Sequence, residues 1–232
     1  FKKLGKYAAS FLFDAAEDLQ DPDMQAAVPP DFNYAFLCCL PKVASRTDAT
    51  HGDVHAPSRT RPLSVVNTDN RLIANAYRLL LEPVVNKFVS EMQRGFLPDR
   101  SMLANVIDVD LQAMRISLQH PRGAVVLFDF ASAFPSLSQE YMWQVLEHVG
   151  IPACIIDAIK KLYKNNKHFI KVKSGVFPSF TATSGVRQGC PLSPLFFALV
   201  ADVLLRRLHD KLPHSLTRAF ADDTAMVMPN FA

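Results

Sequence analysis

The chain has 232 residues, of which 49% are hydrophobic, so it can bury a sizeable core and is not expected to be disordered. Its net charge is only +3, which permits nucleic-acid binding without indicating it. The four cysteines form no Cys-x-x-Cys pair, which argues against a disulfide framework or a zinc site and favours an intracellular, reducing compartment.

The N-terminal part of the chain predicts a helix and then two strands. We expect residues 1–35 to form a helix that leads into a loop. The short apolar run 36–40 ends at Pro41 and predicts a strand. Residues 43–60 are polar and rich in turn formers, so they predict a mobile loop before a returning strand.

Two long amphipathic helices are predicted next. Apolar residues recur at helical spacing between Leu72 and Phe88, with Asp69 or Asn70 available as an N-cap. A second helix is predicted from about Ser101 until His120 and Pro121 break it.

The remaining segments predict a mixture of strands and helices. A buried strand is expected at 124–128, helices at 138–149, 152–163 and 194–212, a hairpin around Gly175, and two short strands at 218–220 and 224–228. There is no regular βαβ alternation and no glycine-rich phosphate loop. The pattern therefore predicts an α+β fold with an antiparallel sheet and helices packed on one face.

Three aspartates stand out by position. Asp129 follows the predicted strand 124–128, and Asp222 and Asp223 lie in a predicted tight turn between two strands. Clustered carboxylates are natural ligands of Mg²⁺, and two such ions can support an in-line displacement at phosphorus. Taken alone, the same residues could be ordinary turn and capping residues.

Neighbouring motifs favour the metal-binding interpretation. The chain resembles, from about residue 36 to 228, the reverse transcriptase domain of non-LTR retrotransposons, which is related to group II intron reverse transcriptases. The resemblance rests on five segments in the family's order: 61–67 (Arg-Pro-Leu-Ser and Asn67), 93–101 (Gln-Arg-Gly-Phe-Leu-Pro-Asp-Arg-Ser), 128–134 (Phe-Asp-Phe-Ala-Ser-Ala-Phe), 185–194 (Gly-Val-Arg-Gln-Gly-Cys-Pro-Leu-Ser-Pro) and 220–223 (Phe-Ala-Asp-Asp).

The resemblance implies the fingers and palm of a right-hand polymerase. Residues 1–35 would be an N-terminal extension, 36–122 part of the fingers, and 123–232 the palm. Because the sequence given continues for only nine residues after Asp223, we expect the thumb to be missing.

The resemblance also implies the metal ligands and a sugar-selecting residue. Asp129 and Asp222 would be the main ligands of two Mg²⁺ ions, which Mn²⁺ could replace, and Asp223 a weaker one. Phe134 would exclude the 2′-hydroxyl of a ribonucleotide; without the motif, core packing would explain it. Pro135 stands where the family commonly has a second aspartate, which is expected to alter the loop rather than abolish catalysis.

Four further residues match positions that hold the incoming nucleotide. Gln188 and Gly189 would lie against the nucleotide and template, where glycine allows close backbone approach. Arg61 and Lys42 would hold the triphosphate by charge-assisted hydrogen bonds.

A basic stretch interleaved with aromatic residues lies between the motifs. It could follow a phosphate backbone or form a solvated face, and both alternatives stay open. Its members are Lys160, Lys161, Lys164, Lys167, Lys171 and Lys173, with Tyr163 and Phe169.

The resemblance implies an RNA-directed DNA polymerase that adds dNTPs to a primer, from a retrotransposon whose parent protein could carry a fused endonuclease. Its partners would be an RNA template and a DNA primer. No membrane partner is expected, because no apolar run approaches the roughly 18 residues that span a bilayer. The alternatives are a non-catalytic RNA-binding or maturase-like descendant and a decayed element copy.

Overall fold

The computed structural model of the chain describes residues 5–23, 28–172 and 174–230. The chain forms two compact units, each assembled from two separate stretches. The first unit comprises residues 1–76 and 150–191, and the second comprises residues 77–149 and 192–232. The sequence-based division was contiguous, so these units do not correspond to it, and the assignment of fingers and palm stays a prediction.

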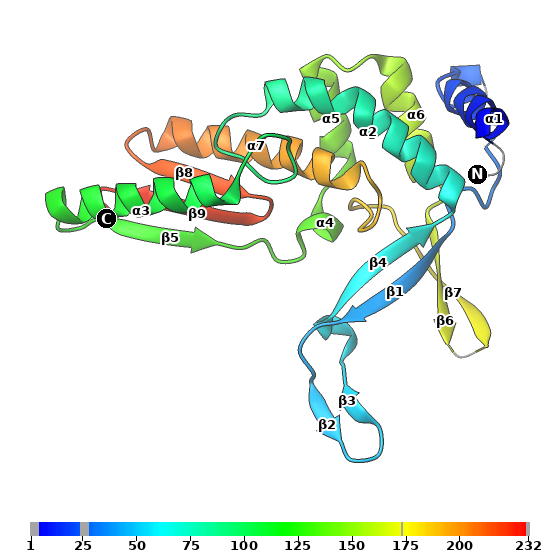
Figure 1. Cartoon of the computed structure of the whole chain (residues 1–232), viewed down its shortest axis with the longest axis horizontal. Coiled ribbons are helices and arrows are strands. Elements are labelled where there is room, and N and C mark those ends of the chain that lie inside the picture. Colours follow the sequence, from blue (N-terminus) through cyan, green and yellow to red (C-terminus); the bar gives the residue numbers. More distant parts are fainter. Residues whose placement is uncertain (1–4, 24–27, 173, 231–232) are drawn as a thin grey trace. The chain divides into compact units, whose positions relative to one another are not determined.

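The first unit is built on a four-stranded sheet with the order β4-β1-β6-β7 (Figure 1). β1 is antiparallel to β4 and parallel to β6, where Ala35 is opposite His168. β6 and β7 form the hairpin expected around Gly175, which begins β7. The elements are α1 (Gly5–Asp18), β1 (Ala35–Pro41), β2 (Arg46–Asp48), β3 (Gly52–Val54), η2 (Pro57–Arg59), β4 (Thr60–Val66), α6 (Ala153–Tyr163), β6 (Lys167–Val172) and β7 (Gly175–Thr181).

The segment 43–60 is more regular than expected. In place of a loop it forms the β2–β3 hairpin and the short 3₁₀ helix η2. Asp48 Oδ1 accepts hydrogen bonds from the backbone amides of Thr50 and His51 at 2.8 and 3.1 Å, which builds the turn. Turn-forming residues thus close a hairpin here.

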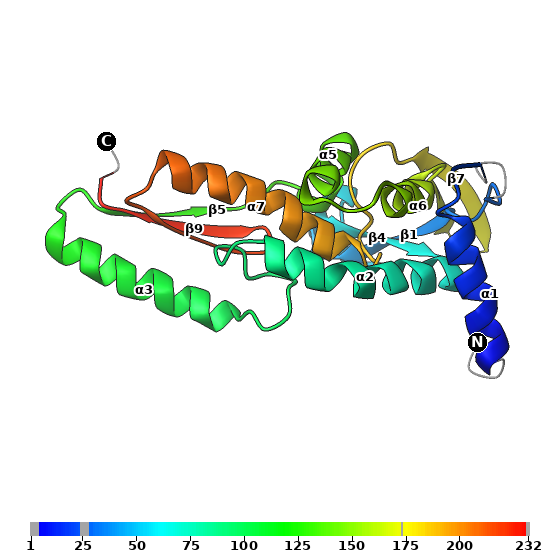
Figure 2. The same ribbon diagram turned by 90° about the horizontal axis from the view of Figure 1, so that it is seen from above.

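The second unit contains an antiparallel sheet with the order β5-β9-β8. Both α3 and α7 contact this sheet and run beside its strands (Figure 2). The elements are α3 (Met102–Gln119), β5 (Ala124–Phe128), α4 (Ala133–Ser136), α5 (Gln139–Val149), α7 (Ser193–Lys211), β8 (Leu216–Phe220) and β9 (Asp223–Met228). The helix α2 (Thr68–Phe88) begins in the first unit and ends in the second.

The strand predicted to be buried, β5, is in fact an edge strand among the described residues. Only β9 pairs with it, and Val125 and Leu127 are 48% and 76% exposed. A continuous apolar run does not reveal whether a strand is central or at an edge, because both can be equally apolar. The apolar side chains of Leu103, Ile107 and Leu111 on α3 are exposed as well.

Helix boundaries largely confirm the sequence-based expectations. Ser101 caps α3, with its hydroxyl oxygen accepting a hydrogen bond from the backbone amide of Leu103 at 3.2 Å. The N-cap expected at Asp69 or Asn70 is wrong, because α2 starts at Thr68 and both residues lie in its first turn.

Among the described helices, none has both the length and the apolar character required to cross a membrane.

Candidate active site

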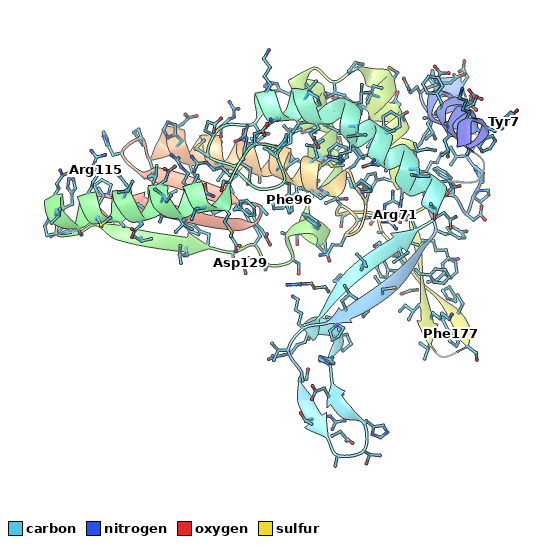
Figure 3. All side chains as sticks on the ribbon, viewed as in Figure 1. Tyr7, Arg71, Phe96, Arg115, Asp129 and Phe177 are labelled. Atoms are coloured by element: carbon cyan, nitrogen blue, oxygen red, sulfur yellow. The ribbon has the colours of Figure 1, made fainter. Side chains whose placement is uncertain are left out.

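The register of the three-stranded sheet brings the three aspartates to one end of it. Phe128 is the last paired residue of β5 and lies opposite Thr224 of β9, so Asp129 and Asp223 adjoin the same strand pair. Phe220 pairs with Asp223, which leaves Ala221 and Asp222 as the two residues of the β8–β9 turn. Figure 3 shows Asp129 just beyond the end of β5.

The carboxylates are accessible to solvent and have no protein partner. Asp129 and Asp223 are exposed and Asp222 is half-buried, and none of the three side-chain carboxylates forms a hydrogen bond or an ion pair with a described residue. Asp129 follows the edge strand β5, so its carboxylate is more hydrated than it would be at the end of a buried strand. Their oxygen atoms are therefore free to bind a cation.

The donor chemistry of these residues fits Mg²⁺, but the three side chains do not together form a cluster that could hold the ion. In residues 5–23, 28–172 and 174–230, no group of three or more His, Cys, Asp or Glu side chains is close enough to hold a metal ion. The carboxylates thus share a sheet end without forming a finished metal site. Their role as metal ligands stays a prediction.

Phe134 lies on α4, in the same motif segment 128–134 as Asp129. Its ring packs against the rings of Phe197 and Phe96, with centroid separations of 5.3 and 6.0 Å. The side chain is half-buried. Both earlier interpretations therefore stay open, since a packed ring with a free edge can also contact a sugar.

The β8–β9 turn has a neighbour that the sequence analysis did not single out. Gln93 is fully buried, and its side-chain amide forms two hydrogen bonds with the backbone of Ala221. Gly95 lies so close that an added Cβ would be 2.0 Å from the nitrogen of Ala221. Both residues belong to the segment 93–101 that carries the family resemblance, but the motif alone did not reveal which turn they contact.

Gln188 and Gly189 belong to the first unit, where they lie beside β4. The backbone amide of Ser64 donates a 2.8 Å hydrogen bond to the carbonyl oxygen of Gln188. Gly189 has a φ of +108°, and an added Cβ would be 2.9 Å from the carbonyl oxygen of Ser64. The close approach expected of this glycine is therefore made to β4, and its approach to a nucleotide stays a prediction.

The residue before this pair fixes the loop from its other side. Arg187 is 3% exposed and donates a 2.6 Å hydrogen bond to the carbonyl oxygen of Leu162. Its guanidinium lies 5.1 Å from the centroid of the Tyr163 ring. This buried cation ties the loop to the end of α6.

The two expected triphosphate ligands are exposed and lie near each other along the β1–β4 ladder. Arg61 lies on β4 opposite Leu40. Lys42 follows β1 and donates a backbone hydrogen bond to Arg59 at 3.0 Å. Both side chains can reach solvent, as phosphate binding would require. The aspartates and Phe134 belong to the second unit, whereas Arg61 and Lys42 belong to the first.

The basic stretch does not form one uniform solvated face. Lys161 is only 7% exposed and its ammonium donates to the carbonyl oxygen of Asp21. Lys167 lies 5.4 Å from the centroid of the Phe169 ring. Lys164 and Lys171 are exposed, whereas Lys173 lies outside the described residues. Only part of the stretch is therefore available to a phosphate backbone.

The fold is similar to that of solved telomerase structures. Its backbone is similar to telomerase from Candida tropicalis truncated from its C-terminal domain, with a TM-score of 0.62, 13% identity, and coverage of 88% of this chain and 45% of that one. A second telomerase structure from this organism, in complex with a fragment of telomeric RNA, has a TM-score of 0.60 and 12% identity over 88% of this chain and 37% of that one. At these identities the likeness concerns the fold alone.

Sequence comparison defines the family. Residues 47–230 match the family described as reverse transcriptase (RNA-dependent DNA polymerase), and the chain belongs to this family. It is 31% identical over 179 residues to the Pol polyprotein of the retrotransposable element R2DM of Drosophila melanogaster, covering 73% of this chain and 16% of that protein. It is 26% identical over 212 residues to the 149 kDa protein of transposon TX1 of Xenopus laevis, covering 86% of this chain and 15% of that protein. These relatives confirm the resemblance to non-LTR retrotransposon proteins, and the chain spans about a sixth of their length.

Proposed function

We propose that this chain supplies the fingers and palm of an RNA-directed DNA polymerase encoded by a retrotransposon. The observation that supports this best is the placement of Asp129, Asp222 and Asp223 at one end of the β5-β9-β8 sheet, free of protein partners, in a chain of the reverse transcriptase family. The reaction would join the 3′-hydroxyl of a primer to the α-phosphate of a dNTP, with pyrophosphate as the leaving group.

We assign the binding of two Mg²⁺ ions, or Mn²⁺ in their place, to these three carboxylates. When bound, the ions would lower the pKa of the attacking hydroxyl and neutralise charge on the phosphates. The chain supplies the oxygen ligands from a strand end and an adjoining turn. Asp129 and Asp222 are the main ligands in this proposal, and Asp223 the weaker one.

The remaining site residues would bind and select the nucleotide. Phe134, packed on Phe197, would present its free edge to the sugar and exclude a 2′-hydroxyl. Gln188 and Gly189 would contact the nucleotide and template, supported by the hydrogen bond from Ser64. The exposed cations Arg61 and Lys42 would hold the triphosphate.

Primer extension tests this proposal. The protein in its full natural length would be assayed on a poly(rA)/oligo(dT) template-primer with Mg²⁺ or Mn²⁺, beside the Asp222→Ala variant. We expect the wild type to incorporate dTTP and the variant to lose this activity. Template binding without any incorporation by the wild type would instead indicate a non-catalytic RNA-binding protein.

A further inference from the structure

The turn that carries Asp222 has an unfavourable backbone conformation. Ala221 precedes Asp222 and has a φ of +60°, in the left-handed region that a residue with a Cβ rarely adopts. Such conformations persist only where the surrounding structure holds them, and they often occur at functional sites. The contacts of Ala221 therefore decide where the Asp222 carboxylate lies.

Gln93 makes these contacts with both polar atoms of its side chain. Its Nε2 donates to the carbonyl oxygen of Ala221 at 3.0 Å, and its Oε1 accepts from the amide of Ala221 at 3.0 Å. Oε1 also accepts from the amide of Gly95 at 2.8 Å. The side-chain amide thus pairs with Ala221 as a backbone peptide of a neighbouring strand would.

The backbone beside Gln93 continues this pairing along β8. The amide of Ala219 donates to the carbonyl oxygen of Met92 at 2.7 Å, and the amide of Arg94 donates to the carbonyl oxygen of Ala219 at 2.8 Å. Gly95 then passes the turn at a distance that leaves no room for a Cβ. Residues 92–95 therefore lie along β8 and its turn, with an isolated parallel bridge between Gln93 and Ala219.

One arginine anchors the segment 92–95. Arg100 donates to the carbonyl oxygens of Asn86, Val89 and Ser90, which lie at the end of α2 and just after it. It also donates to the carbonyl oxygen of Gln93 at 2.7 Å. The backbone of Gln93 is thus held in place by Arg100, independently of the contacts that its side chain makes with the turn.

We infer that Gln93 is a positioning residue that holds the Ala221–Asp222 turn and thereby places the Asp222 carboxylate for the reaction. The inference rests on the proposed function for the catalytic consequence, but the effect on the turn is independent of it. The side-chain amide of Gln93 is fully buried and forms hydrogen bonds with both backbone polar groups of Ala221. An apolar side chain at this position could not form these hydrogen bonds. Gln93 touches no reacting atom, so it acts through Ala221.

The main test replaces Gln93 with methionine, which has a similar length and no amide. Gln93→Glu is a second variant, because it keeps an acceptor for the Ala221 amide and loses the donor. The matched control is Asn105→Leu: Asn105 is also buried and donates to the same strand, at the carbonyl oxygen of Ala219, two residues before the turn. All proteins would be full length and checked for folding by circular dichroism.

Two measurements separate positioning from general stability. In Gln93→Met, amide hydrogen exchange at Ala221 should accelerate and kcat should fall, each by at least about tenfold, while KM for the dNTP stays within about threefold. In Asn105→Leu, exchange at Ala221 and kcat should stay within about threefold of wild type, even where the melting temperature falls. Gln93→Glu should show both effects to a smaller degree.

Three outcomes would overturn the inference. Unchanged exchange at Ala221 in Gln93→Met would show that the side chain does not hold the turn. Faster exchange with unchanged kcat would show that the contact does not matter for the reaction. Equal losses of kcat in Gln93→Met and Asn105→Leu would indicate a general effect on β8. An active Asp222→Ala protein would instead contradict the proposed function, whatever the exchange measurement shows.

Discussion

The carbonyl oxygen of Gln188 accepts a 2.8 Å hydrogen bond from the backbone amide of Ser64. This bond joins two segments that the family resemblance treats separately, the strand β4 and the loop that carries Gln188 and Gly189. His168 adds to the junction, because its Nε2 lies 2.9 Å from the hydroxyl oxygen of Ser64. The shape of the loop therefore depends on a strand far away in the sequence.

Gly189→Ala should weaken both the fold and nucleotide binding. The φ of +108° disfavours a Cβ by about 1–3 kcal/mol, and the new Cβ would lie only 2.9 Å from the carbonyl oxygen of Ser64. We expect a lower free energy of unfolding in urea and an increase of about tenfold in KM for the dNTP. Gly52→Ala is the control, since Gly52 has a φ of +71° with no atom within 4 Å of an added Cβ. An equal loss of stability in both variants would contradict the role of the contact with Ser64.

Asp129→Ala and Asp222→Ala should retain the fold and reduce extension to less than about a tenth of the wild-type rate. Each change removes an oxygen ligand that has no protein partner, so little packing is lost. Asp223→Asn should be milder, since an amide oxygen can still coordinate. Asp110→Ala, at an exposed position on α3, is the control and should be fully active. Extension above a tenth of the wild-type rate by Asp129→Ala or Asp222→Ala would refute the two-metal assignment.

Phe134→Val should admit ribonucleotides. Removing the ring opens space where a 2′-hydroxyl would otherwise clash, and the ratio of rNTP to dNTP incorporation on one template measures this change. Phe130→Ala is the control: the Phe130 ring packs edge-on against Phe197, with centroids 6.1 Å apart, so the variant disturbs the same aromatic cluster. If sugar preference is unchanged in Phe134→Val, or changes equally in Phe130→Ala, the ring serves packing alone.

Stability should fall as pH drops below about 6.5, in part because of His168. Burial lowers the pKa of His168 below its ordinary value of 6.5, and the nearby Arg187 lowers it further, against a hydrogen bond with Asn166 that raises it. Below pH 6.5 the unfolded chain binds a proton on this histidine more readily than the folded chain does. The free energy of unfolding therefore falls as the pH decreases from 6.5 to the lower pKa of the folded state, and is constant below it. Above pH 6.5 both states are neutral and this contribution is constant.

Melting temperatures between pH 5 and pH 8 would measure this effect. In His168→Gln the curve should be flatter below pH 6.5, whereas His214→Gln, at an exposed position, should follow the wild type. Parallel curves for wild type and His168→Gln would show that His168 does not contribute to the pH dependence.

The sequence by itself determined most elements and the positions of the three acids along them. The helix expected from about Ser101 is α3, β6 and β7 form the hairpin around Gly175, and Asp222 lies in the β8–β9 turn. Caps, turns and periodicity depend on residues a few positions apart, so a sequence motif can reveal them. The family motifs extended this to the fold class, which the comparisons confirm.

Only the tertiary structure decided which distant segments meet. The parallel pairing of β1 with β6, the exposed edge position of β5 and the contact between Gln93 and Ala221 each depend on chain segments far apart in sequence. The sequence does not distinguish a buried glutamine from an exposed one, an edge strand from a central one, or an exposed helix face from a covered one. The outcome depends on the packing of the whole unit, because burial and long-range hydrogen bonds form only when distant segments of the chain pack together.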